Sequence, residues 1–596
     1  MTGIVQQVKR ASANAIRELY SIDIQEDSVL VNATKPEFEG DYTVVLFAFI
    51  KLLKTSPEAL GQALGKRMVE QNPQLFSSFN VIKGFLNLVI TDSYWISFLQ
   101  EQAANPDYGI QPRRNEKVMV EYSSPNTNKP LHLGHLRNNF LGWSLAAILE
   151  ANGYDIVKTC IVNDRGIHIC KSMLAWEMFA DGATPASTGI KGDHFVGDYY
   201  VKFNNVYKEE VRVLVEGGMK EEEAEKEAPV LKAAQQMLQR WEAGDPAVLD
   251  LWRRMNEWVY EGFDITYRRI GSDFDKKYYE SNTYLLGKKI VEQGLKKNVF
   301  FKKEDGSVWI DLTPDGLDEK VVMRRDGTSV YITQDIGLAE QKQEEFHANQ
   351  SIYVVGDEQN YHFKVLKLIC EKLQLPSAEN IFHLSYGMVE LPSGKMKSRE
   401  GTVVDADDLL DEMVAISQQK TEELGKVKDF TGDELAALYD TLGLGALKFF
   451  LLRVDPKKRM IFHPEESIDF HGFTGPFVQY TYARIRSVIR KIGDAASAVP
   501  FGPEAESLLP LERELVLHLE QFPVLLQEAG AEHDPSKLAL YLFVLARIFN
   551  SFYTAHSIAQ AETEGKKQLR IRLAEMTASV IKTGMRLLGI GVPERM

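Results

Sequence analysis

The order of apolar and polar positions predicts a chain in which short strands alternate with helices over its central part. Apolar runs typical of buried strands stand at 117–122, 155–162, 307–312, 329–333 and 351–356. After the first run, apolar residues recur at a spacing near 3.6 from Leu133 to Ile148, and Asn152-Gly153 is a typical helix end. Alternating strands and helices favour right-handed βαβ units, so we expect an α/β fold with a doubly wound parallel sheet.

The same pattern divides the chain into three parts. Residues 1–110 begin with a helix, contain short strand-like runs and end in a turn-rich linker, as expected of a small N-terminal α/β domain. Residues 111–410 hold the alternating strands and helices, with a charged helical insertion at about 186–270, and residues 411–596 are almost entirely helical. Because ligands bind at the carboxyl ends of strands in doubly wound sheets, we expect the functional residues where the strands of the middle part end.

Composition favours a multidomain protein of the cytoplasm. At 596 residues and 44% hydrophobic content the chain can bury several cores. Its three cysteines, Cys160, Cys170 and Cys370, are too few and too scattered for a disulfide framework or a zinc ribbon, which suits a reducing cytosol. The start is polar and has no secretory signal. The longest apolar run, 43–53, is too short to cross a bilayer, so we expect a buried core helix there and no membrane span.

The net charge of −15 by itself argues against a nucleic-acid partner. A local basic stripe on an acidic body is nevertheless sufficient for phosphate contacts. Basic residues cluster at Arg453 with 457–459, at 484–491 and at 566–572. Each cluster could equally be a solvated helix face, so composition alone does not predict RNA binding.

The most specific chemistry lies at the junction between the first strand and the helix that follows it. Residues 121–135 read EYSSPNTNKPLHLGH, so turn-forming residues, a lysine and two histidines stand between strand and helix. His132 and His135 are spaced i, i+3 at a helix N-terminus, where free backbone N–H groups and the helix dipole favour phosphate. Gly134 has no Cβ and lets a flat ring approach the backbone.

Two other interpretations of the histidine pair are weaker. Two histidines could ligate a metal, but no nearby cysteine or third histidine completes a site, and we expect none. A single histidine at a helix end is more often an ordinary polar residue. The whole pattern, Ser-Pro-Asn, a lysine and then His-x-Gly-His between a strand and a helix, favours a nucleotide site.

This segment resembles the first signature of class I aminoacyl-tRNA synthetases, in the form SSPN-x-x-KP-x-H-x-GHLR typical of arginyl-tRNA synthetases. Similar family elements stand at 84–87 (GFLN), 192–200 (GDHFVGDYY), 475–485 and 587–596. The resemblance implies a Rossmann-like catalytic domain over 111–410, an N-terminal domain over 1–110 that contacts the corner of tRNA, and a helical anticodon-binding domain over 411–596. The insertion is much shorter than the editing domains of the isoleucine, leucine and valine enzymes, so we expect no proofreading site.

The family's arginine-binding residues carry over onto the predicted strand ends. They are Glu121, Ser124, Asn126, His135, Tyr331, Asp335 and Gln359. A guanidinium has five donors in a rigid plane, which carboxylates at Glu121 and Asp335 could satisfy. Asn126 and Gln359 would orient the α-amino and carboxylate end of arginine. Taken alone, Glu121 could be a solvent-exposed strand end and Asp335 a helix N-cap.

A second signature stands at 394–402, GKMKSREGT, which is similar to the Lys-Met-Ser-Lys-Ser loop of the class but places Ser398 where the key lysine usually stands. In arginyl enzymes the lysine before His-x-Gly-His, here Lys129, is thought to compensate. The resemblance therefore implies catalysis by Lys129, His132, His135, Lys395 and Lys397. It implies ATP binding by His132, Gly134, His135, Lys395, Met396, Lys397, Ser398 and Arg399. Without the resemblance, a basic loop of this kind is common on protein surfaces.

The resemblance also implies contacts with tRNA. The matching residues are Asn87 in the N-terminal part and Gln479, Tyr480, Tyr482 and Arg484 in the C-terminal part. Aromatic rings stack on unpaired bases, although packing between helices is the more ordinary role of such residues.

The function that the resemblance implies is that of an arginine–tRNA ligase that uses L-arginine, ATP with Mg2+ and tRNA(Arg), and that acts as a monomer without a membrane. Two other classes fit less well. A small adenylyltransferase with His-x-Gly-His would lack the long helical C-terminal part, and a non-catalytic RNA-binding relative would be expected to lose His132, His135 or Asp335. Among synthetases, the cysteine enzyme is disfavoured because zinc ligands are missing.

Overall fold

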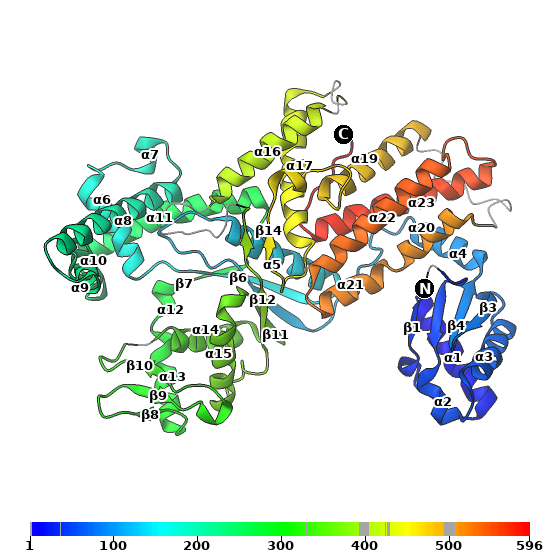
Figure 1. Cartoon of the computed structure of the whole chain (residues 1–596), viewed down its shortest axis with the longest axis horizontal. Coiled ribbons are helices and arrows are strands. Elements are labelled where there is room, and N and C mark those ends of the chain that lie inside the picture. The colour runs from blue at the N-terminus through cyan, green and yellow to red at the C-terminus, as the bar shows by residue number, and fades with distance from the viewer. Residues whose placement is uncertain are drawn as a thin grey trace.

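The computed structural model describes residues 3–35, 37–328, 330–392, 404–423, 425, 430–493 and 507–596. Figure 1 shows an elongated molecule with the N-terminal domain at one end, the insertion helices at the other and the central sheet between them. The helical C-terminal domain lies along one side of that sheet, so that the sheet's first helix is covered by it (Figure 1).

The central sheet confirms the predicted doubly wound fold. Its five strands are β5 (Lys117–Glu121), β6 (Asp155–Val162), β7 (Lys276–Tyr279), β11 (Gln350–Gly356) and β12 (Ile381–Tyr386). They are all parallel and lie in the order β12-β11-β5-β6-β7. The chain therefore builds outward from β5 in both directions, and the crevice of such a sheet opens where the order reverses, between the carboxyl ends of β5 and β11.

The first helix of the sheet is buried on nearly every side. α5 (Leu133–Ala151) follows β5 and contacts β6 and β11 on one side and the C-terminal helices α17, α21, α22 and α23 on the other. A helix covered from both sides is apolar all round rather than on one stripe. The junction between β5 and α5 is therefore carried by a helix that is enclosed on both sides.

Two of the predicted strands are wrong as members of the parallel sheet. The run 307–312 forms β9 (Val308–Ile310) in a separate antiparallel sheet with β8 (Phe301–Lys302) and β10 (Lys320–Met323). The described part of 329–333 begins the helix α14 (Tyr331–Phe346) instead of a strand. Short runs of β-branched and aromatic residues fit a strand or a helix end equally well, and tertiary contacts decide between them. The strands β7 and β12 were not predicted.

Helices cover the sheet and form the insertion. On the side of β7 and β12 lie α12 (Glu280–Thr283), α13 (Leu286–Lys296), α14 and α15 (Asn360–Lys372), with the short turns η2 (Thr313–Asp315) and η3 (Asp357–Gln359). The helix α6 (Ile167–Phe179) packs against the insertion helices α8, α10 and α11. The insertion consists of α7 (Pro185–Thr188), α8 (Gly192–Glu216), α9 (Glu221–Glu227), α10 (Pro229–Glu242) and α11 (Pro246–Ile270). The predicted helical character of this segment is confirmed.

The N-terminal domain packs helices on an antiparallel sheet. Its elements are α1 (Ile4–Tyr20), η1 (Glu26–Ser28), β1 (Val31–Ala33), β2 (Tyr42–Val45), α2 (Phe47–Leu53), α3 (Pro57–Gln71), β3 (Phe76–Ile82), β4 (Phe85–Ile90) and α4 (Asp92–Gln102). The run 43–53 is thus a strand followed by a helix, and Phe47 and Leu52 on that helix are about half exposed, so the single buried core helix predicted there is wrong.

The C-terminal domain is helical, as predicted. It comprises α16 (Ala406–Glu423), α17 (Gly432–Leu452), α18 (Pro464–Ser467), α19 (Gly475–Ile492), α20 (Pro510–Glu520), α21 (Phe522–Ala531), α22 (Pro535–Ala555) and α23 (Glu564–Leu587), and it is joined to the catalytic part by the parallel pair β13 (Val389–Glu390) and β14 (Met460–Ile461). By length and composition α17 and α22 could cross a membrane, but 67% and 50% of their apolar windows are buried inside the structure, where they contact neighbouring helices. They are accounted for as core helices of this domain.

Candidate active site

The turn between β5 and α5 is held by buried hydrogen bonds. Ser123 has a left-handed backbone with φ of 63° and is fully buried. Its N–H donates to Asn138 Oδ1 at 2.6 Å, and its hydroxyl shares a 2.7 Å hydrogen bond with the Tyr267 hydroxyl. A non-glycine residue keeps such a backbone only where its surroundings impose it, which is typical of functional turns. The chain is thereby reversed directly after the strand end and led toward the N-terminus of α5.

The two histidines of the signature cap α5. Gly134 N–H donates to His132 Nδ1 at 3.1 Å, and His132 N–H donates to His135 Nδ1 at 3.1 Å. The two rings lie 3.9 Å apart between centroids. A Cβ on Gly134 would stand 3.0 Å from His132 Cε1, so a glycine is needed for the His132 ring to fold back over the helix end.

The cap hydrogen bonds set which ring nitrogen carries the proton, and burial sets the charge of both rings. Because each Nδ1 accepts a backbone hydrogen bond, a neutral ring carries its proton on Nε2. Burial, with the Lys129 ammonium nearby, lowers the pKa of His132 to about 3, and burial together with His132 and Lys129 holds the pKa of His135 well below its usual value. Both residues are therefore neutral donors at physiological pH, with Nε2–H available to phosphate. Burial also lowers the pKa of Lys129.

The segment that follows the second signature lies against this helix end. Leu133 N–H donates to Val404 O at 3.2 Å, and Ala406 N–H donates to Leu131 O at 3.0 Å. The predicted ATP-site residues Lys395, Met396, Lys397, Ser398 and Arg399 lie outside the described residues. The described chain resumes at Val404, which lies beside the N-terminus of α5.

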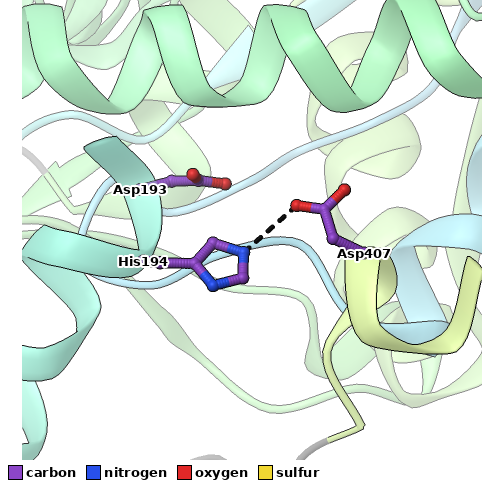
Figure 2. A group of neighbouring side chains, drawn as sticks. All are labelled: Asp193, His194 and Asp407. Atoms are coloured by element: carbon purple, nitrogen blue, oxygen red, sulfur yellow. Dashed lines mark hydrogen bonds and ion pairs between the residues drawn. The ribbon is translucent and has the colours of Figure 1, made fainter. Parts of the chain in front are cut away.

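A group of charged side chains joins the insertion to this segment. Figure 2 shows Asp193 and His194 at the start of α8 and Asp407 at the start of α16, with a 3.1 Å hydrogen bond between His194 Nε2 and Asp407. Their ligand atoms lie within 4.8 Å of one another, a spacing that a metal could use. Lys191 Nζ, however, already lies 2.6 Å from Asp407 Oδ2 and 3.0 Å from Asp193 Oδ2. Lys191 thus supplies the positive charge that a metal ion would otherwise provide. Its contacts with Asp193 and Asp407 hold the start of α16 against the insertion.

Three of the predicted arginine-binding residues follow strand ends of the central sheet, and two lie on α14. Ser124 and Asn126 are exposed after β5, and Gln359 is exposed after β11. Tyr331, 71% exposed, begins α14 and borders a cavity of about 700 Å³ together with Arg165, Glu280 and Arg324. One turn into the same helix, Asp335 Oδ2 accepts a 2.7 Å hydrogen bond from His362 Nε2.

The structure revises the expectation for Glu121. Its carboxylate is buried, accepts a hydrogen bond from Lys342 Nζ at 2.5 Å and another from Thr159 Oγ1 at 3.1 Å. The Lys342 side chain is only 2% exposed, so the two charges neutralise each other inside the domain. A guanidinium would have to share this carboxylate with Lys342 or displace the lysine to bind Glu121.

A second carboxylate, Glu280, was missed by sequence reasoning. It directly follows β7 and lines the cavity beside Tyr331. The pKa of Glu280 is raised to about 7, chiefly by burial; Arg165 lowers this pKa, and Asp164 and Asp335 raise it. A half-buried carboxylate of raised pKa beside another acidic residue is typical of a site that receives a cation. Sequence reasoning missed Glu280 because the strand before it, Lys276–Tyr279, is too polar and too short to be predicted as a buried strand.

The structure also revises part of the predicted tRNA surface. Gln479 is fully buried and donates to Thr441 O at 3.0 Å and to Gly591 O at 2.7 Å, and Tyr482, 2% exposed, donates to Glu594 Oε1 at 2.7 Å. Both residues hold the C-terminal tail against α19. Arg484 and Tyr480 are only partly buried, and the Arg484 guanidinium lies 4.8 Å from the centre of the Tyr480 ring.

In the N-terminal domain, Asn87 is 1% exposed and accepts a hydrogen bond from Thr43 Oγ1 at 2.7 Å. It forms the floor of a cavity of about 330 Å³ whose rim includes Lys35, Phe38, Lys83 and Phe85. The exposed lining residues, which are Lys35, Glu37, Lys83 and Phe85, are easier for a ligand to reach than Asn87.

Comparison with known proteins covers all three parts of the chain. Residues 6–90 match the arginyl tRNA synthetase N terminal domain, residues 99–463 match the catalytic domain of tRNA synthetases class I (R), and residues 478–596 match the DALR anticodon binding domain. An arginine–tRNA ligase of Amoebophilus asiaticus is 52% identical over 99% of both chains, and one of Parabacteroides distasonis is 51% identical over 100% of both. The solved arginyl-tRNA synthetase of Thermus thermophilus superposes with a TM-score of 0.79 at 25% identity, over 100% of both chains. The chain therefore belongs to the arginyl-tRNA synthetase family, within the class I aminoacyl-tRNA synthetases.

Proposed function

We propose that this protein is an arginine–tRNA ligase, which activates L-arginine with ATP and transfers it to the 3′ end of tRNA(Arg). The observation that carries the proposal is the histidine pair at the N-terminus of α5, fixed as two neutral Nε2–H donors at the point where the strand order of the sheet reverses. A cavity bordered by Tyr331 and Glu280 adjoins the strand ends on the same edge of the sheet.

In the first step a carboxylate oxygen of arginine attacks the α-phosphorus of ATP, and the bond to the leaving pyrophosphate breaks. Negative charge develops on the phosphate oxygens, and catalysis consists mainly of stabilising it. His132 and His135 donate from Nε2, the N-terminus of α5 adds its dipole, and Lys129 supplies a cation beside them. Mg2+ enters with the phosphates as part of the substrate. Lys395, Lys397 and Arg399 are proposed to contact the pyrophosphate.

Arginine is held by its two ends. Asp335 and Glu280 face the guanidinium, with Tyr331 beside it, while Ser124, Asn126, His135 and Gln359 bind the α-amino and carboxylate groups. Two carboxylates satisfy the planar donors of a guanidinium better than one. Because His362 donates to Asp335 in this structure, the incoming guanidinium must share that carboxylate or replace the imidazole.

In the second step a hydroxyl of the terminal ribose of tRNA attacks the carbonyl of arginyl-adenylate, and AMP leaves. The rim of the N-terminal cavity, with Asn87 beneath it, contacts the corner of the tRNA, and Tyr480 with Arg484 contacts the anticodon loop. The protein acts as a monomer in the cytoplasm, and activation requires bound tRNA.

An ATP–pyrophosphate exchange assay tests this function. Exchange should depend on L-arginine and on added tRNA(Arg), and the product should be arginylated tRNA. Lysine and citrulline serve as matched controls, because lysine lacks the planar guanidinium and citrulline lacks its positive charge. Exchange with a different amino acid, or none with arginine in the presence of tRNA(Arg), would refute the assignment.

A further inference from the structure

The turn between α17 and β14, residues 455–459, carries cations that the proposed mechanism does not use. Lys457 and Lys458 are exposed, and within the described residues neither side chain has a hydrogen bond or ion pair. In the two other basic clusters, several cations are paired. Arg486 forms an ion pair with Glu594, while Lys566 and Arg570 bind the buried Glu512. In a chain of net charge −15, these two adjacent lysines form a local positive surface.

The backbone of this turn is held by a buried arginine. Arg137 is fully buried; its Nη2 donates to Lys458 O at 2.8 Å and to Pro456 O at 3.3 Å, and its Nη1 donates to Met388 O at 3.3 Å. Burying a guanidinium is costly, and burial lowers the pKa of Arg137 to about 10. A mere connection between a helix and a strand does not need a buried charge to fix its carbonyls.

Further contacts fix the turn from its other sides. Gly387 N–H donates to Pro456 O at 2.8 Å, and Lys457 N–H donates to Asp455 Oδ1 at 2.9 Å. The packing on Gly387 is close, since a Cβ there would lie 2.5 Å from Arg459 N. Lys457 and Lys458 therefore project from a backbone that is fixed before any partner binds, which reduces the entropy lost on binding.

The turn is also tied to the active-site edge of the sheet. Arg137 stands two residues after His135 on α5, and Arg459 forms an ion pair at 3.2 Å with Asp357, the residue after β11. The 3′-terminal ribose of the tRNA has to reach arginine at this edge, so phosphates of the acceptor end pass close to cations that border it.

We propose that Lys457 and Lys458 form a phosphate-binding surface for the acceptor end of tRNA, and that Arg137 is the positioning residue that holds it beside the active site. The inference rests on the proposed function, because it takes tRNA as the partner. Sequence-independent phosphate contacts of this kind set the register of a nucleic acid on a protein.

The test compares the double variant K457Q/K458Q with the control K220Q/K226Q. The control removes two exposed lysines, Lys220 just before α9 and Lys226 on it, and changes the net charge by the same amount. Figure 1 shows α9 at the far end of the insertion. Binding of tRNA(Arg) transcript is measured between 0.05 and about 0.3 M salt. Each lost phosphate contact lowers the slope of log affinity against log salt by about 0.7–0.9 and weakens binding about 5- to 8-fold at 0.1 M. K457Q/K458Q should show a slope smaller by about 1.5, with ATP affinity unchanged.

The outcomes separate the inference from the function. A slope equal to that of K220Q/K226Q, or weaker ATP binding with unchanged tRNA binding, overturns the phosphate surface for tRNA. Wild-type protein that does not arginylate tRNA(Arg) overturns the proposed function itself. As a second measurement, R137K keeps the positive charge but loses the planar guanidinium that contacts three carbonyls. It should weaken tRNA binding without changing the slope of log affinity against log salt. Its circular dichroism spectrum and melting temperature are measured to show that the variant is folded.

Discussion

Replacing Glu280 by glutamine should weaken arginine binding and at the same time stabilise the protein. Glu280 is proposed to pair with the guanidinium, and a hydrogen bond to a charged group contributes about 1.5–3 kcal/mol. E280Q should therefore raise the KM for arginine about 10- to 150-fold, while the KM for ATP changes little. Steady-state arginylation with each substrate varied in turn measures both quantities.

The pH dependence of the same variant gives an independent check. Since the pKa of Glu280 is about 7 in the unliganded protein, the carboxyl is protonated below pH 7, whereas the guanidinium needs it ionised. For the wild type, kcat/KM for arginine should fall about tenfold per pH unit below 7, and E280Q should lack this step.

Stability should change in the opposite direction. A carboxyl whose pKa is raised from 4.5 to about 7 binds more protons in the folded state, so the folded protein loses stability as pH rises through that window. At pH 8 E280Q should be more stable than the wild type by about 1–3 kcal/mol, measured by urea unfolding.

Glu121→Gln is the matched control, because the structure gives this carboxylate the opposite role. It leaves Lys342 buried without its partner and should destabilise the protein by about 3–5 kcal/mol. If E280Q leaves the KM for arginine unchanged, or if E121Q raises that KM without lowering stability, the assignment of the two carboxylates is refuted.

Three further predictions concern the nucleotide site and the C-terminal domain. Lys129→Ala should lower tRNA-dependent ATP–pyrophosphate exchange about 100- to 1,000-fold with little change in tRNA affinity, because it removes a cation beside the α5 N-terminus; equal losses in both would contradict this role. His132→Asn keeps a good N-cap but removes a ring whose pKa falls to about 3 on folding. The free energy of unfolding of this variant should therefore fall less between pH 7 and pH 4 than that of the wild type. An equal fall in both proteins would argue against a buried neutral His132. Gln479→Leu should cost about 1–3 kcal/mol of unfolding free energy and leave tRNA affinity within about twofold; a large loss of affinity at unchanged stability would show that this side chain reads a base.

The geometry of the junction between β5 and α5 could be predicted from the sequence because it depends on neighbours in the chain. The strand, the turn, the helix N-terminus and both histidines fall within 117–135, and the caps that fix the rings join residues two and three apart. The central strands β5, β6 and β11 could also be predicted, because each is a local apolar run. The polar strand β7 gave no such signal, and the carboxylate that follows it was lost with it.

The guanidinium site could not be predicted in the same way, because the availability of a carboxylate depends on partners far along the chain. Glu121 and Glu280 both follow strands of one parallel sheet, and at the level of local sequence they are equivalent. What separates them is Lys342, which reaches Glu121 from a helix 221 residues later, whereas the cation nearest Glu280, Arg165, also pairs with Glu242. Gln479 shows the same limit, since its partner Gly591 lies 112 residues away. A motif can thus identify the strand ends where a cationic substrate binds, but which acidic residue is free to bind it follows only from the pairing of charges in the folded chain.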